Sequence, residues 1–64
     1  MKVRDVLKRL EEDRWRVTRM RGSHRVLKHP VKTGIVVVAG QSNKEVAGGT
    51  LKSIWRQAEL EERK

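Results

Sequence analysis

Residues 15–30 read WRVTRMRGSHRVLKHP, and their pattern predicts a β-hairpin. Apolar and polar side chains nearly alternate over residues 15–20, as in a strand with one buried face. Gly22-Ser23 is a turn signal, and residues 24–29 predict the second strand of the pair. Pro30 ends that strand because proline has no amide hydrogen to donate to the ladder.

A helix precedes the hairpin and a third strand follows it. Apolar side chains recur at helical spacing between Lys2 and Asp13. These residues are Val3, Val6, Leu7 and Leu10. After the hairpin, Lys32-Thr33-Gly34 indicates a turn, and the β-branched run Ile35–Val38 is typical of a largely buried strand.

A second helix is predicted at the end of the chain. Residues 40–49 are polar and contain glycine, which indicates a loop in which only Val46 turns inward. Thr50 is then a suitable N-cap. The apolar stripe of this last helix comprises Leu51, Ile54, Trp55 and Ala58.

The predicted class is therefore α+β, with the element order α-β-β-β-α. We expect a single domain over residues 1–64, built from a three-stranded antiparallel sheet with both helices on one face. The other face of the sheet stays exposed to solvent. Double-stranded-RNA-binding domains have a similar order of elements.

Charge is distributed unevenly along this chain of net charge +8. Residues 1–13 and 45–64 each hold equal numbers of basic and acidic side chains, so the whole excess lies within residues 14–44. The cations there are Arg14, Arg16, Arg19, Arg21, Arg25, Lys28, Lys32 and Lys44. Such segregation favours a nucleic acid as partner. Solubility, protection of a sheet edge, or an acidic protein partner are the alternatives.

Composition excludes several other classes of function. Without cysteine, and with two histidines, the chain lacks a familiar zinc ligand set, and we expect neither a metal nor a small-molecule cofactor. No apolar run is long enough to span a membrane and no secretory signal is evident, so we expect a soluble, cytoplasmic protein. Phenylalanine and tyrosine are absent, which argues against a sheet that stacks bases on aromatic rings.

The two histidines are the candidate acid–base groups. In one regular strand, His24 and His29 point to opposite faces, so they do not act together. His24 follows the Gly-Ser turn and is flanked by Arg21 and Arg25, a setting that suits RNA cleavage by the ribose 2′-hydroxyl. A structural or surface role is the alternative for His24, and a structural role is favoured for His29.

A second candidate is the segment Gly48-Gly49-Thr50-Leu51-Lys52. Glycines before a helix leave free amides that can bind a phosphate, with Lys52 nearby. The alternative is an ordinary capped helix start, because the same residues satisfy turn geometry and N-capping.

Several short motifs together resemble the HicA toxins, also called YcfA-like proteins, over nearly the whole chain. They are Gly22-Ser23-His24, His29-Pro30, Lys44-Glu45 and Gly49-Thr50-Leu51-Lys52-Ser53-Ile54. The resemblance implies a double-stranded-RNA-binding-domain-like fold, metal-independent cleavage of mRNA as an mRNA interferase, and neutralisation by a HicB-type antitoxin. It also implies that His24 is the catalytic residue.

RNA binding is expected from residues of the basic segment and the last helix. They are Arg19, Arg21, Ser23, Arg25, Lys28, Lys44 and Lys52. The chain departs from the resemblance at Ala39 and Gln41, where many members carry a proline and a second histidine. It departs also at Glu59, where members often have glycine, which suggests that the last helix continues into the charged tail. A non-catalytic RNA-binding module using the same basic face is the alternative function.

Overall fold

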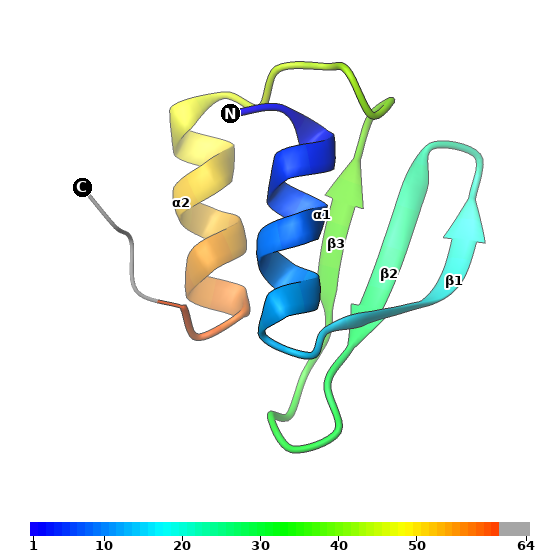
Figure 1. Cartoon of the computed structure of the whole chain (residues 1–64), viewed down its shortest axis with the longest axis vertical. Helices are drawn as coiled ribbons and strands as arrows, with labels where there is room; N and C mark the ends of the chain where they lie inside the picture. Colours follow the sequence, from blue (N-terminus) through cyan, green and yellow to red (C-terminus); the bar gives the residue numbers. More distant parts are fainter. Residues whose placement is uncertain (61–64) are drawn as a thin grey trace.

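The computed structural model describes residues 1–60 and has the predicted order of elements (Figure 1). The elements are α1 (Val3–Glu12), β1 (Arg16–Arg21), β2 (His24–Lys28), β3 (Val36–Ala39) and α2 (Gly48–Gln57). β2 is the central strand and pairs antiparallel with β1 on one side and with β3 on the other. The predicted α+β class and topology are confirmed.

One face of the sheet packs against both helices. Leu27 of β2 and Val36 of β3 are cross-strand partners and are fully buried. Their cluster also contains Val3, Val6, Leu10, Trp15, Val38, Ile54, Trp55 and Ala58. Because buried residues of both helices share this single cluster, α1 and α2 cover the same face. The predicted apolar stripes of both helices are confirmed.

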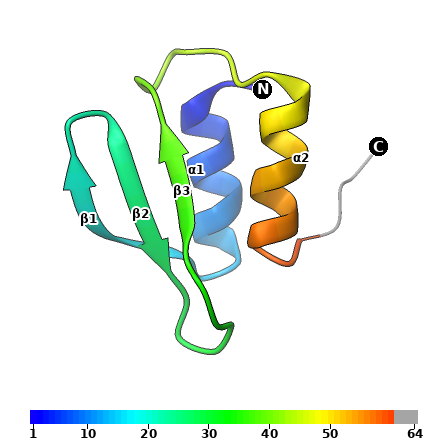
Figure 2. The ribbon, with the colours of Figure 1, turned by 180° about the vertical axis from the view of Figure 1, so that it is seen from behind.

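The β1–β2 hairpin extends beyond the helix layer. Figures 1 and 2 show the two helices side by side next to β3, with the hairpin reaching away from them. All residues of β1 are exposed. Its regular alternation is interrupted by a β-bulge between Val17 and Arg19. Such a bulge places an additional residue opposite the partner strand and increases the local twist.

β3 is only half buried, contrary to the prediction of a largely buried strand. Val36 and Val38 face the core, whereas Ile35 and Val37 are 48% and 41% exposed. The reason is that the helices cover one face only, so each second residue of the β-branched run remains in solvent. The β-branched composition favoured a strand but did not indicate whether the face of β3 opposite the helices is buried.

The start of α2 also differs from the prediction. The helix begins at Gly48 with Ala47 as N-cap, and no side chain caps it. Thr50 is therefore inside the first turn, and its predicted role as N-cap is wrong. Val46 is partly buried against the core, as predicted.

Both helices end in the same backbone motif. After α2, the amide of Glu59 bonds to the carbonyl of Arg56 and that of Leu60 bonds to Trp55. Glu59 has a φ of +55°, so it takes the left-handed conformation that usually selects glycine. The suggestion that α2 continues through this position is wrong, and its extension into residues 61–64 lies outside the described residues.

Hydrogen bonds join the loop after β3 to the start of α1. The amides of Val3 and Arg4 donate to the carbonyls of Lys44 and Ser42 at 2.9 and 3.0 Å. A β-bridge joins Lys2 to Glu45, and the terminal amine of Met1 pairs with the Glu45 carboxylate. Two amides at the start of α1 are thereby satisfied by the loop that runs on to α2.

Candidate nucleic-acid interface

The open face of the sheet carries His24. Residues of β2 alternate between faces, and Leu27 points to the core, so His24, Val26 and Lys28 point to solvent. Their cross-strand partners lie on the same face. These are Arg21, Arg19 and Arg16 from β1, and Ala39 and Val37 from β3. We call this surface, defined by His24, Val26, Lys28 and these partners, the open face.

The open face combines several cations with no carboxylate among the described residues. Asp5, Glu11 and Glu12 are on α1, Asp13 caps its end, and Glu59 follows α2. Glu45 is in the loop bonded to the amino terminus. The predicted positive charge is therefore concentrated on the open face, to which β1 alone contributes Arg16, Arg19 and Arg21. Such a surface attracts a polyanion.

His24 is at the tip of the hairpin and is exposed. Gly22, with a φ of +59°, provides the left-handed residue of the tight turn, and Arg21 and His24 are the pair that closes it. On its other side His24 pairs with Ala39, the last residue of β3. The backbone of His24 is thus fixed by strand pairing on both sides, and its side chain is on the same face as that of Arg21.

Arg25 does not share this face. It pairs with Val38, whose side chain is in the core layer, so Arg25 is directed to the side opposite His24. Its Nη1 donates to the carbonyl of Gly40 at 2.8 Å and, at 3.5 Å, to that of Ser23. The amide of Gly40 donates to the same Ser23 carbonyl at 3.2 Å. Arg25 therefore ties the hairpin tip to the end of β3.

The remaining predicted RNA-binding residues are in three places. Ser23 is exposed in the turn beside His24, and Lys44 is exposed in the loop after β3. Lys44 lines a shallow hollow with Ala39 and Thr50, between the end of β3 and the start of α2. Lys52 is on α2, in the helix layer, and the structure does not bring it to the open face.

His29 has a structural environment, as expected. Its side chain is 3% exposed, and its Nδ1 accepts the amide hydrogens of Val31 and Lys32 at 3.0 and 2.9 Å. The proton is therefore assigned to Nε2, which donates to the carbonyl of Asp13 at 2.6 Å. The ring also makes an edge contact with Trp15. These contacts join the end of α1 to the turn after β2.

Within the part of the chain that the structure describes, Lys32 is the one predicted cation with an acidic partner. Its Nζ is 2.6 Å from Oδ2 of Asp13 and also donates to the carbonyls of Ala58 and Glu59 at 3.0 and 3.3 Å. This hydrogen bond from Lys32 holds the pKa of the Asp13 carboxyl below its usual value, although partial burial acts in the opposite direction. Lys32 therefore joins both helix ends and does not contribute to the open face.

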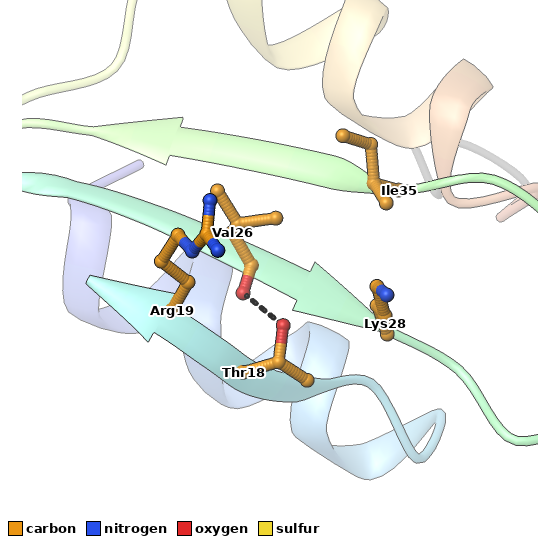
Figure 3. Close-up of a pocket in the computed structure, with 5 residues that line it drawn as sticks. All are labelled: Thr18, Arg19, Val26, Lys28 and Ile35. Atoms are coloured by element: carbon orange, nitrogen blue, oxygen red, sulfur yellow. Dashed lines mark hydrogen bonds between the residues drawn. The ribbon is translucent and has the colours of Figure 1, made fainter. Parts of the chain in front are cut away.

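A hollow in the open face is lined by Thr18 and Arg19 from the bulge, Val26 and Lys28 from β2, and Ile35 before β3 (Figure 3). Of these residues, the sequence analysis missed Thr18, Val26 and Ile35. The Thr18 hydroxyl donates to the carbonyl of Val26 at 3.3 Å. Because residues 35–38 are all apolar, no alternation in the sequence indicated that Ile35 would be exposed.

The described residues contain neither a metal-binding cluster nor a membrane-spanning helix. No group of three or more histidine, aspartate or glutamate residues within the described part of the chain is arranged to hold a metal ion. Among residues 1–60, no helix has the length and apolar character needed to cross a membrane.

The fold and the open face define a small basic α+β domain suited to binding a polyanion. A family model described as the HicA toxin of bacterial toxin-antitoxin systems matches residues 3–60. The chain therefore belongs to the HicA toxin family, and membership implies a cognate antitoxin as its partner. No curated protein matches the chain.

Proposed function

We propose that this toxin is a metal-independent endoribonuclease, an mRNA interferase that blocks translation in the cytoplasm until a HicB-type antitoxin neutralises it. The observation that carries the proposal is the position of His24, exposed on a cationic face to which residues 1–60 contribute no carboxylate. An imidazole, which can serve as a general acid or base, thus lies where a phosphate backbone would bind. Family membership supports the toxin role.

The reaction needs little from the protein. The ribose 2′-oxygen attacks the adjacent phosphorus, an O2′–P bond forms, and the P–O5′ bond breaks. The 2′-hydroxyl proton passes to a base, and the departing 5′-oxygen takes a proton from an acid; His24 provides one of these two groups and water the other. The products are a 2′,3′-cyclic phosphate and a 5′-hydroxyl. One imidazole can perform either proton transfer, a contribution on the order of 10² to 10⁴ in rate.

Three cations of the open face have a defined task in this proposal. Arg21, the cross-strand partner of His24, stabilises the negative charge that develops on the phosphate under attack. Arg19 and Lys28 bind neighbouring phosphates along β1 and β2. Ser23 and Lys44 extend the contacts beyond the hairpin tip, while Arg25 keeps His24 in place from behind.

The chemistry of the products tests this proposal. Purified protein is incubated in EDTA with a long RNA and with the same RNA carrying 2′-O-methyl groups throughout. We expect cleavage of the first RNA only, with cyclic phosphate ends detected by mass spectrometry. Equal cleavage of both RNAs would show that water, not the 2′-oxygen, is the nucleophile.

A second candidate is a non-catalytic RNA-binding module. The composition of the neighbouring positions favours it, because Ala39 and Gln41 provide no further acid–base group beside His24. The same assay separates the two: salt-sensitive binding with RNA that stays intact after prolonged incubation supports the module.

The antitoxin is proposed to neutralise the toxin by covering the open face. Its surface would then be acidic where it contacts Arg19, Arg21 and Lys28, and RNA would compete with it. Addition of the antitoxin should release bound RNA, and a ternary complex of both with the toxin would contradict this arrangement.

A further inference from the structure

The hollow in the open face has a composition that phosphate binding does not explain. Its floor is formed by Val26 and Ile35, and Ile35 is 48% exposed. Arg19 and Lys28 also line this open hollow, whose volume is about 510 Å³. Exposed aliphatic side chains have no favourable interaction with a charged phosphate.

The polar group inside the hollow is already engaged. The Thr18 hydroxyl donates its hydrogen to the backbone carbonyl of Val26, as the dashed line in Figure 3 shows. The floor thus presents aliphatic carbon to solvent, bordered by Arg19 and Lys28. This surface suits a flat ring that is apolar on its face and carries an anionic substituent.

We propose that the hollow holds the base of one unpaired nucleotide in single-stranded RNA, next to the phosphate that His24 acts on. The base face rests on Val26 and Ile35, and the Arg19 guanidinium stacks on it or contacts its edge, as guanidinium planes do in RNA complexes. Lys28 binds the phosphate of that nucleotide. Aliphatic side chains and an arginine thereby replace the aromatic rings that the chain lacks. This inference rests on the proposed function.

The distance from His24 supports the assignment. His24 and Val26 are two residues apart on the same face of β2, about 7 Å at the usual rise of a strand. A neighbouring nucleotide of an extended strand can span this separation. A base that is paired inside a duplex cannot reach the floor, so the hollow selects unpaired RNA.

Binding to single-stranded RNA tests the inference, with His24→Ala as the background so that the RNA stays intact. A short labelled RNA is compared with versions that lack one base at successive positions. We expect Ile35→Thr to weaken binding of the complete RNA about fivefold. Removing the base at one position of the RNA should weaken binding to His24→Ala by a similar factor. The same removal should not weaken binding further when Ile35→Thr is also present, because both changes remove the same contact.

Two variants control for general effects. Val17→Thr changes a residue of similar exposure, 43%, that pairs with Leu27 on the opposite side of the sheet. It should bind all RNAs as the background does. Ile35→Val keeps an apolar surface and should restore most of the lost affinity. Circular dichroism melting verifies that each variant is folded, and a duplex of the same sequence should not distinguish Ile35→Thr from Val17→Thr.

The outcomes separate this inference from the proposed function. Equal affinities of Ile35→Thr and Val17→Thr for single-stranded RNA would overturn the base site, even where the parent protein cleaves RNA through His24. If Ile35→Thr weakens binding but the parent protein never cleaves RNA, the base site is supported and the catalytic proposal is wrong.

Discussion

Lys32 and Arg25 are basic residues whose charged groups donate hydrogen bonds within the fold. Lys32 bonds to Asp13 and to carbonyls at the end of α2, and Arg25 bonds to the carbonyl of Gly40. Both lie in the segment whose excess charge predicted an anionic partner. The sequence revealed the size of the excess, whereas separating the cations bonded inside the fold from those left on the open face required knowledge of their contacts.

The Asp13–Lys32 pair makes stability depend on pH. Because the pKa of Asp13 is lowered in the folded chain, the stabilisation is complete above the unfolded-state pKa of about 3.9 and is lost as the pH falls through the lower folded-state value. We expect Asp13→Asn to reduce the free energy of unfolding by about 1–2 kcal/mol at pH 7. Urea denaturation of parent and variant should show this difference shrinking below about pH 4; a constant difference would contradict the assignment.

Arg25 is expected to act as a positioning residue. Arg25→Gln loses the bond that ties the hairpin tip to Gly40, so kcat for RNA cleavage should fall about tenfold while RNA affinity changes little. Arg25→Lys, which can still donate to that carbonyl, should recover part of the rate. A selective loss of affinity would instead place Arg25 in direct contact with RNA.

At the scale of elements, the helix ends depart most from the sequence prediction. Arg14 and Glu59 have φ values of +74° and +55°, although neither is glycine. In each case the backbone motif is completed by a following apolar residue, Trp15 or Leu60, packed in or against the core. Tertiary packing therefore overrides the local preference, which the residue identities alone did not indicate.

Glu59→Gly should stabilise the domain. Glycine adopts the left-handed conformation without the penalty of a β-carbon, a gain of about 1 kcal/mol, while the backbone bonds of Glu59 are kept. For a domain of this size the melting temperature should rise by about 4–8 °C. Differential scanning calorimetry measures it. Glu59→Ala is the matched control and should give no comparable increase, and equal shifts in both variants would refute the explanation.

For the whole molecule, hydrophobic periodicity was sufficient to predict the class, the order of elements and the two-layer arrangement. It also placed His24 at the hairpin turn. It did not identify the hollow, because that site depends on the bulge in β1 and on the exposed side of β3. Nor did it separate Lys52, in the helix layer, from the cations of the open face.

The salt dependence of RNA binding shows whether the open face or the net charge of the molecule binds RNA. Replacing Arg19, Arg21 and Lys28 together with glutamine should reduce the slope of log K against log salt by about two, because each phosphate contact contributes about 0.7 with single strands. Replacing Arg4, Lys8 and Arg56, which are exposed on the helices, removes the same charge. That control should leave the slope nearly unchanged; equal effects would mean that net charge, not the open face, binds RNA.

The proposed role of His24, which is to move a proton during cleavage, can be tested with the single-turnover cleavage rate of one RNA. The rate is measured in EDTA and with protein in excess, for the parent and for His24→Ala. Saturation removes differences in binding. We predict a rate at least about 100-fold lower for His24→Ala, whereas equal rates in the two proteins would contradict the claim.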